Sequence, residues 1–343
     1  MLKKMDQEVF ISDDDLVIKV IHEDGSETSI KTVSSCDTIR NPVTGELEFN
    51  NIERNKFSVF ASSSRGCFMN CNFCYLTIKN CDYKKLEEQQ ILQNLKDAVK
   101  EQMLFKPETK NRYVKLCWMG MGEDQIAQPE RTYNITKDFL SWMMENEYAV
   151  GIDGVDLATV LPPINNNWIS VFHTLDNLVD TFPLNPNNKF RVHGQGMPAN
   201  AQYINRSPFR LFYSLHSGIQ ETRDKIIPKA MPLDKAIPLL KDYSNDNVNN
   251  VIFHHMFMDG QNDSDQEVEA LLETIDKYDL YNYEFRILRY NYCNNTSFGE
   301  SPRFNEIIDK IVGKIPFLKV QISTGVEVRA ACGQFIVKQY ESM

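Results

Sequence analysis

The sequence predicts an α/β protein built around an incomplete parallel barrel. From residue 57 onward, segments rich in β-branched and aromatic residues alternate with amphipathic helical segments. Strands that alternate with helices in this way form parallel sheets. Six such units fall short of the eight that close a full barrel. With 343 residues, 42% of them apolar, the chain is long enough to bury a barrel-sized core without disulfides or structural metals.

Residues 1–56 read as a separate lead-in, and residues 57–343 as the barrel with a C-terminal extension. The lead-in stretch DLVIKVIHEDGSETSIKT alternates apolar and polar residues on both sides of a DGS turn. This pattern is typical of a β-hairpin, so we expect the lead-in to be short and rich in β-structure.

The barrel strands are expected in six segments, which are FSVFAS (57–62), YVKLCWM (113–119), GVDLATV (154–160), FRLFYSL (209–215), NVIFHHMFM (250–258) and EFRILRY (284–290). The clearest helix is residues 84–104, where Leu92, Leu95, Val99 and Met103 recur at helical spacing. A helix over 303–312 and a strand over 317–323 follow the sixth barrel strand.

Composition and charge indicate the cellular location of the protein and the kinds of surface that it can bind. No segment reaches the roughly 20 apolar residues that a membrane span needs, and the N-terminus lacks the apolar stretch of a signal peptide. We therefore expect a cytoplasmic protein whose eight cysteines are thiols or metal ligands. The formal net charge of −10 argues against a broad nucleic-acid-binding face, although a local basic groove remains compatible with it.

Three cysteines, Cys67, Cys71 and Cys74, follow the first barrel strand with the spacing C-x3-C-x2-C. Chemistry in such barrels belongs at the C-terminal ends of the strands. One interpretation is three unrelated buried thiols, and another is a zinc site. Structural zinc, however, is bound by four ligands, usually in two close pairs. A [4Fe–4S] cubane normally takes four thiolates. Three cysteines leave one iron free to bind a small molecule, which explains the missing fourth ligand.

This triplet, with an aromatic residue before its third cysteine, resembles the signature of the radical S-adenosylmethionine (SAM) superfamily. Six segments also resemble the RlmN/Cfr group of rRNA adenine methyltransferases, in the same order. They are SSSRGCFMNCNFC (62–74), MGMGED (119–124), YSLHSGIQETRDKIIP (213–228), MDGQNDSD (258–265), LRYN (288–291) and RAACGQF (329–335). The resemblance implies a partial (β/α)6 TIM-type radical SAM barrel.

The resemblance implies a role for each matched residue. Cys67, Cys71 and Cys74 would bind the [4Fe–4S] cluster, whose open iron chelates SAM. Gly122 and Glu123 would bind the amino group of SAM. Further SAM contacts would come from Ser214, Leu215, His216 and Asn291. One electron from the cluster would then cleave SAM and form a deoxyadenosyl radical.

Cys332 would be the methyl carrier in this reading, although a lone cysteine beside two alanines is also typical of a small buried thiol. The implied reaction is methylation of an sp2 carbon of an adenine-type base, in rRNA or tRNA. The rival hypothesis is a radical SAM lyase or mutase acting on a free, nucleobase-like small molecule, and a degenerate binding protein is a third. We expect a monomer that receives electrons from flavodoxin or ferredoxin.

The sequence departs from the family pattern in several places. The family's N-terminal RNA-recognition domain has no counterpart in the 66 residues before Cys67. Phe60 stands where the family has its resolving cysteine, and Cys293 is our first candidate for a substitute, with Cys36 second. Ala158 stands where the family has a SAM-binding serine, and the neighbouring Thr159 is the candidate to compensate for it. Glu27 is the candidate for the family's N-terminal carboxylate base.

Overall fold

Parallel strands form the centre of the protein. In this computed structural model, the described residues are 7–32, 37–40, 47–49, 55–122, 124–191, 203–205, 207–244, 250–291, 298–321 and 325–330. The central parallel strands are β6 (Lys56–Phe60), β9 (Tyr113–Trp118), β10 (Gly151–Thr159), β13 (Phe209–Ser214), β14 (Val251–His255), β15 (Glu284–Leu288) and β16 (Leu318–Gln321). The six predicted barrel strands are confirmed, and β16 extends the parallel series to a seventh.

The sheet is an open array with antiparallel strands at each edge. Its order is β1-β2-β3-β6-β9-β10-β13-β14-β15-β16-β4-β5. The outer strands are β1 (Glu8–Ile11), β2 (Val17–Ile21), β3 (Glu27–Lys31), β4 (Asp37–Arg40) and β5 (Leu47–Phe49). Two small pairs stand apart from it: β7 (Ser64–Arg65) with β8 (Lys84–Lys85), and β11 (Lys189–Arg191) with β12 (Tyr203–Asn205). The predicted α/β class with an incomplete barrel is therefore confirmed.

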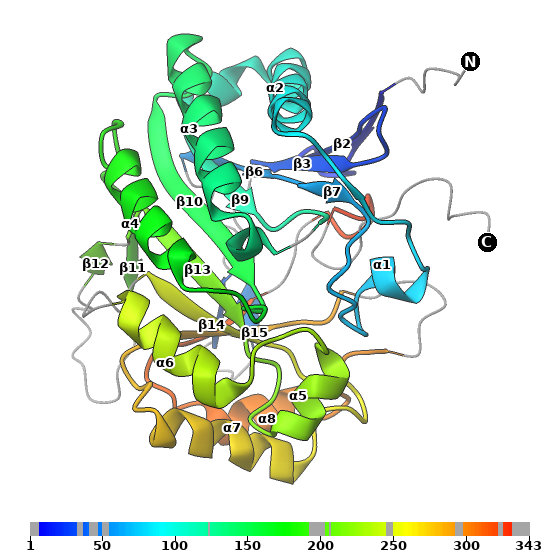
Figure 1. The fold of residues 1–343 in the computed structure, drawn as a ribbon, viewed down its shortest axis with the longest axis vertical. Helices are drawn as coiled ribbons and strands as arrows, with labels where there is room; N and C mark the ends of the chain where they lie inside the picture. The colour runs from blue at the N-terminus through cyan, green and yellow to red at the C-terminus, as the bar shows by residue number, and fades with distance from the viewer. Residues whose placement is uncertain are drawn as a thin grey trace.

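Helices cover the outside of the curved sheet (Figure 1). They are α2 (Glu88–Phe105), α3 (Pro129–Glu145), α4 (Asn167–Val179), α6 (Leu233–Ser244), α7 (Asp265–Lys277) and α8 (Phe304–Ile311), with shorter turns α1 (Tyr75–Ile78), α5 (Gln220–Ile226), η1 (Pro107–Asn111) and η2 (Gln125–Ala127). In α2, Leu95 and Val99 are buried, and Leu92 and Met103 are half-buried against the same core, so the predicted face is confirmed. The predicted start at residue 84 is wrong, because Lys84 and Lys85 form β8, which pairs with β7. Each helix among the described residues is too short or too polar to cross a lipid bilayer.

Alternation along each strand separates two environments. In β13, Phe209, Leu211 and Tyr213 belong to the main apolar core that the outer helices cover. Successive side chains point to opposite faces, so Arg210 and Ser214 lie on the inner face of the barrel. The inner face therefore carries the side chains that lie beneath a site at the strand ends.

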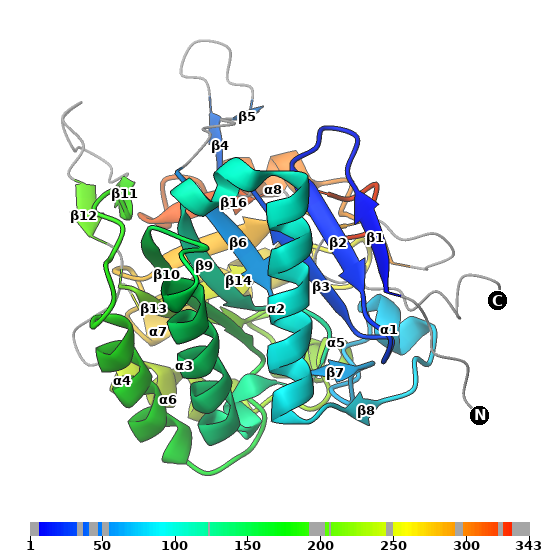
Figure 2. The same ribbon diagram turned by 90° about the horizontal axis from the view of Figure 1, so that it is seen from above.

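The strands of the lead-in continue the sheet of the barrel. β2 and β3 pair antiparallel around a turn at 22–26, and β3 pairs with β6 from Ser29↔Phe60 to Lys31↔Ser58. Figure 2 shows β1, β2 and β3 lying side by side next to β6. Every residue of β2 and β3 is buried, whereas β1 exposes part of Val9, Phe10 and Ile11.

Candidate active site

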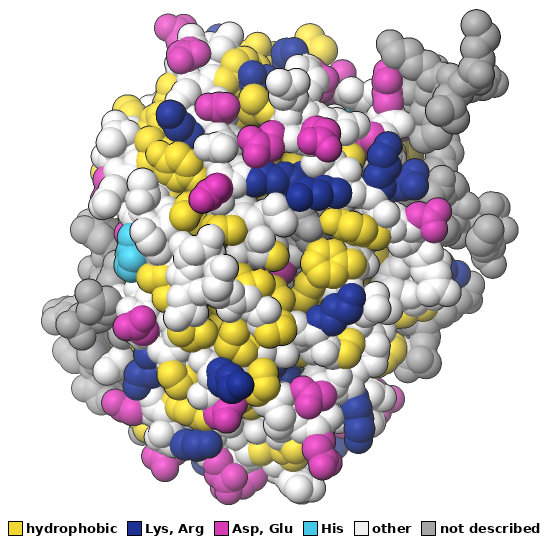
Figure 3. Space-filling view, in the orientation of Figure 1, with side chains coloured by type: hydrophobic (Ala, Val, Ile, Leu, Met, Phe, Trp, Pro, Cys, Tyr) yellow, Lys and Arg dark blue, Asp and Glu magenta, His cyan; other side chains and the backbone are white. Residues whose placement is uncertain are grey.

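The three cysteines lie between β6 and α1, around a cavity at the C-terminal ends of the barrel strands. Cys67, Cys71 and Cys74 are half-buried and all three line this cavity, whose volume is about 160 Å³. In the space-filling view, apolar side chains gather around a hollow near the middle of one face of the molecule (Figure 3).

The loop that carries the cysteines is fixed against its neighbours on two sides. At Gly66, where φ is +68°, a Cβ would lie 2.5 Å from the carbonyl oxygen of Asp82. On the other side, the amide of Asn72 donates to the carbonyl of Ile226 at 2.9 Å, and Lys229 Nζ donates to the carbonyl of Phe68 at 2.5 Å. The positions of the cysteines are therefore set by backbone contacts.

The surroundings of the three thiols fit an anionic cluster. Cys74 is the N-cap residue of α1, and the amide of Met69 donates to Cys67 Sγ at 3.4 Å. Burial lowers the pKa of Arg223, and Cys71 is among the neighbours that oppose this shift. A helix start, an N–H donor and a guanidinium all favour thiolate over thiol. Among the described residues, no three His, Cys, Asp or Glu side chains converge on one metal-ion position.

The glycines after β9 are required by close packing against β6. A Cβ on Gly120 would lie 2.6 Å from the carbonyl carbon of Ala61 and 2.7 Å from Ser62 Oγ. Gly122 has a φ of +138°, and a Cβ there would lie 2.9 Å from Ser64 Oγ. Both glycines line the cavity. Glu123, which the sequence assigned to the amino group of SAM, lies outside the described residues.

Asp124, which the sequence analysis passed over, joins two walls of the cavity. Its carboxylate accepts hydrogen bonds from Thr159 Oγ1 at 2.8 Å, the amide of Val160 at 2.7 Å and the amide of Ile126 at 3.1 Å. Burial raises the pKa of Asp124 to about 6, and these hydrogen bonds oppose the shift. The signal available in the sequence was an acidic pair at the end of MGMGED, of which we assigned only the first residue.

The end of β10 supplies Ala158 and Thr159 to the cavity. The hydroxyl of Thr159 donates to Asp124 and accepts from the amide of Leu161 at 2.7 Å. The Thr159 hydroxyl is therefore already hydrogen-bonded to two groups of the protein itself.

The end of β13 places the three residues of SLH in different surroundings. Ser214 lines the cavity, Leu215 is fully buried in the main core, and His216 is 3% exposed. The His216 ring packs edge-on against Phe73, which lines the cavity, at a centroid distance of 5.0 Å. Burial lowers the pKa of His216 to about 3, and Arg223 adds to the shift, so the imidazole is neutral. Its Nδ1 has no hydrogen-bond partner within the part of the chain that the structure describes.

The remaining predicted residues are placed only in part. Asn291 is half-buried just beyond β15, outside the cavity lining. Cys332 and the substitute thiols Cys293 and Cys36 lie outside the described residues. Phe60 is half-buried at the end of β6, with Lys31 Nζ 4.9 Å from its ring centroid.

Glu27 lies beside the segment that leads toward Cys332. It is 1% exposed and pairs with Lys19, with 2.9 Å between Oε2 and Nζ. Lys19 Nζ also donates to the carbonyl of Arg329 at 3.4 Å. The buried ion pair of the lead-in thus contacts the residues that precede Cys332 in the sequence.

Comparison with known proteins identifies the relatives of this chain. No family model matches it. It is 26% identical over 186 residues to "Ribosomal RNA large subunit methyltransferase Cfr" of Shouchella clausii, covering 51% of this chain and 52% of that protein. It is 21% identical over 344 residues to "Dual-specificity RNA methyltransferase RlmN" of Nautilia profundicola, covering 98% and 84%.

A solved structure shares the fold. The crystal structure of a radical SAM methyltransferase from Sphaerobacter thermophilus superimposes with a TM-score of 0.61 at 20% identity, covering 95% of this chain and 79% of that one. The match to the Cfr protein spans about half of that protein, whereas the match to the RlmN protein spans most of both chains. The chain is therefore similar in sequence to RlmN and Cfr RNA methyltransferases, and it shares the fold of a radical SAM methyltransferase.

Proposed function

We propose that this protein is a radical SAM methyltransferase that methylates an sp2 carbon of an adenine-type base. The observation that supports this most is the convergence of segments far apart in sequence. The cysteine loop, the glycines after β9, the end of β10 and Ser214 of β13 line one cavity at the C-terminal ends of the strands. The fold and the relatives point to the same class of enzyme.

Cys67, Cys71 and Cys74 would hold a [4Fe–4S] cluster, and SAM would lie along Gly122 and Ser214. Bound together and reduced by one electron, these cofactors supply a carbon-centred radical. The close approach of Gly122 to the cysteine loop would bring its backbone to the amino end of SAM. Glu123, Leu215 and Asn291 remain proposed SAM contacts. His216 would act as a neutral hydrogen-bonding group, because its pKa lies far below neutral pH.

Cys332 would carry the methyl group to the base as S-methylcysteine. The names of the relatives support RNA as the substrate and partner of this chain. We further propose that the protein works in the cytoplasm as a monomer, with flavodoxin or ferredoxin as its electron donor. The rival is a radical SAM lyase or mutase on a free nucleobase-like molecule, which would need no methyl carrier.

Anoxic purification tests the cluster. The protein is expected to be brown and to hold about four irons per chain, as a cubane cluster requires. Replacing Cys67, Cys71 or Cys74 with Ala should remove the colour and the cleavage of SAM. The matched control is Cys81→Ala, since Cys81 is buried outside the cavity lining and burial raises its pKa to about 11. Stoichiometric zinc in a colourless protein would refute the cluster assignment.

Mass spectrometry separates methyl transfer from radical formation. After incubation with SAM, Cys332 of the wild-type protein should gain the mass of one methyl group. Cys332→Ala should keep its iron and its slow cleavage of SAM but transfer no methyl group. Unchanged turnover of Cys332→Ala would favour the lyase or mutase.

A further inference from the structure

Positively charged side chains lie beside the cavity, although the chain as a whole carries a formal net charge of −10. The segment 64–86 contains the cysteine loop and the β7–β8 pair, and it holds four basic residues and one acidic residue. These are Arg65, Lys79, Lys84 and Lys85 against Asp82. Figure 3 shows Lys and Arg side chains above and below the hollow. The charge beside the cavity is thus opposite in sign to that of the whole protein.

The β7–β8 pair places three of these side chains next to the cysteine loop. Arg65 lies opposite Lys84 in the antiparallel register, and Cys67, which lines the cavity, follows Arg65 by two residues. Two residues of extended chain span roughly 7 Å. Lys84 and Lys85 are exposed, and Lys85 Nζ donates to Gln128 Oε1 at 3.1 Å. Arg65 is half-buried, and its Nε has no hydrogen-bond partner among the described residues. The pair of strands therefore holds three cations close to one wall of the cavity.

Two further lysines lie on the other side of the cysteine loop. Lys225 is in the last turn of α5 and Lys229 follows this helix, and both are exposed. Lys229 Nζ lies 5.0 Å from the ring centroid of Phe68 and donates to the carbonyl of the same residue. Because an ammonium group has three N–H donors, the Lys229 side chain can hold this carbonyl and still bind a second acceptor.

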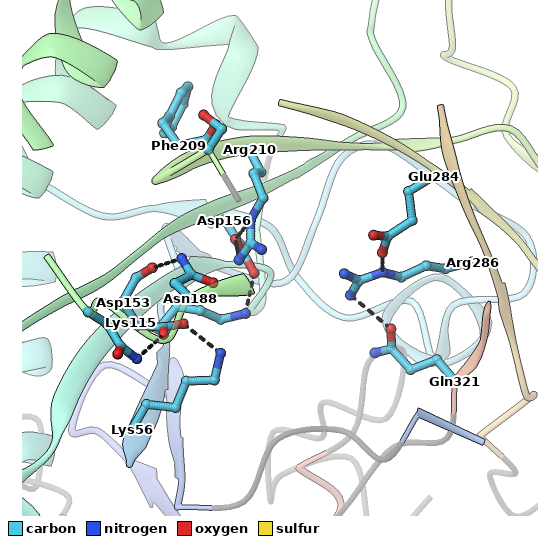
Figure 4. Close-up of polar contacts among 12 residues, drawn as sticks. Lys56, Lys115, Asp153, Asp156, Asn188, Phe209, Arg210, Glu284, Arg286 and Gln321 are labelled. Atoms are coloured by element: carbon cyan, nitrogen blue, oxygen red, sulfur yellow. Dashed lines mark hydrogen bonds and ion pairs between the residues drawn. The ribbon is translucent and has the colours of Figure 1, made fainter. Parts of the chain in front are cut away.

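The lysines beside the cavity differ from the cations inside the barrel. Inside the barrel, Lys56 pairs with Asp153, and Lys115 pairs with Asp156 (Figure 4). By contrast, four exposed lysines beside the cavity pair with no carboxylate within the part of the chain that the structure describes. They are Lys84, Lys85, Lys225 and Lys229. Exposed cations that no carboxylate neutralises attract the phosphates of a nucleic acid.

Two aromatic rings lie next to these lysines. The rings of Phe68 and Tyr83 pack edge-on with 5.3 Å between their centroids, and Tyr83 is 40% exposed. Phe68 stands in the cysteine loop between two residues that line the cavity, Cys67 and Met69. Surfaces that bind single-stranded nucleic acid combine cations for the phosphates with aromatic rings on which bases stack. An acidic electron-transfer protein would also be attracted by the lysines, but it offers no base to stack on Tyr83.

We propose that this surface binds the RNA substrate on both sides of the target adenine. Enzymes that modify a base in a pocket take it out of the stack, so the neighbouring phosphates and bases stay outside the cavity. In this arrangement phosphates lie on the lysines, and a neighbouring base stacks on Tyr83. The inference rests on the proposed function for the identity of the substrate as RNA. We call this surface the basic rim, and its residues are Arg65, Phe68, Tyr83, Lys84, Lys85, Lys225 and Lys229.

Fluorescence anisotropy with a labelled, adenine-containing single-stranded RNA tests the phosphate contacts. On the cluster-loaded protein with SAM, the double variant Lys84→Gln/Lys85→Gln should bind at least about tenfold more weakly at about 0.1 M salt. The slope of log Kd against log salt should fall by roughly 1.4, since each lost phosphate contact removes about 0.7 for a single strand. Lys137→Gln/Lys277→Gln removes the same charge from exposed positions of α3 and α7 and should match the wild type.

Replacing Tyr83 tests the stacking separately. Tyr83→Ala should weaken binding roughly tenfold at every salt concentration and leave the slope unchanged, because stacking releases no counterions. Tyr83→Phe keeps the ring and should retain the wild-type affinity. Iron content and melting temperature identify any variant that has lost the fold.

An unchanged affinity and an unchanged salt slope in the double lysine variant overturn the proposal, as does a wild-type protein that binds no RNA. If the double variant binds RNA normally but accepts electrons from flavodoxin more slowly, the basic rim is a docking site for an acidic protein. Failure of the proposed function has a separate readout. A wild-type protein that binds RNA through the basic rim but leaves SAM uncleaved and Cys332 unmethylated would refute the proposed function alone.

Discussion

Replacing Gly120 with Ala should destabilise the protein and damage the cavity. The new Cβ would lie 2.6 Å from the carbonyl carbon of Ala61, a backbone atom of the strand end that cannot turn away. It would also meet Ser62 Oγ at 2.7 Å, and this oxygen accepts the amide of Met121 at 2.9 Å. Overpacking of this kind costs about 1–3 kcal/mol. Lengthening the 3.0 Å hydrogen bond from Gly120 to Ala61 adds about 1 kcal/mol.

The expected loss is thus about 2–4 kcal/mol in the free energy of unfolding, or roughly 3–6 °C in melting temperature for a chain of this size. Urea unfolding and SAM affinity should be measured together, because the same shift moves Gly122 away from the cysteine loop. Gly299→Ala is the matched control, since a Cβ there meets nothing within 4 Å. If the two variants unfold at the same urea concentration and bind SAM equally, the close packing of β9 on β6 does not have the role that we give it.

Two further changes probe Asp124, which lines the cavity, and Arg223, which donates to the carbonyl of the lining residue Ser214. The pKa of Asp124 is raised to about 6, so the native state binds the proton more tightly than the unfolded chain does. The free energy of unfolding should therefore fall by about 3 kcal/mol as the pH rises from about 4 to about 6. Asp124→Asn should flatten this slope relative to the wild type in urea unfolding at several pH values, and parallel profiles would contradict the assignment. Arg223 is fully buried and donates to the carbonyls of Leu215 at 3.1 Å and Met231 at 2.8 Å. Arg223→Met leaves these acceptors without a donor and should cost about 3 kcal/mol or more; a loss below about 1 kcal/mol would contradict this.

The parallel strands were predictable because each is a short run of β-branched and aromatic residues with a helix after it. The charged side chains on the inner face of these strands, such as Arg210 and Lys115, were not predictable. In FRLFYSL and YVKLCWM, alternation indicates which residues share a face. The same alternation describes a face open to water and a face turned into a barrel, so the sequence alone does not show which of the two carries Arg210 and Lys115.

The cavity was predictable as a set of segments but not residue by residue. Cys67, Gly122 and Ser214 line it together, as strand ends of one parallel sheet should. Leu215 and His216 follow Ser214 directly, yet consecutive residues of an extended strand point to opposite sides. Leu215 faces the core, and His216 adopts a φ of 57° beyond the strand end. The sequence therefore predicted that the three residues of SLH lie close together, but not that their side chains enter different surroundings.

The pairing of β3 with β6 makes the lead-in inseparable from the barrel. Ser29, Ile30 and Lys31 lie opposite Phe60, Val59 and Ser58 in an antiparallel ladder, on the strand that delivers the cysteine loop. Proteolytic removal of the first 50 or so residues would strip that strand of one neighbour and leave its backbone groups without partners. Limited digestion should therefore yield either the intact core with its lead-in or no stable fragment. Hydrogen-exchange measurements should find the amides of β3 and β6 protected to a similar degree, as expected for strands that open together.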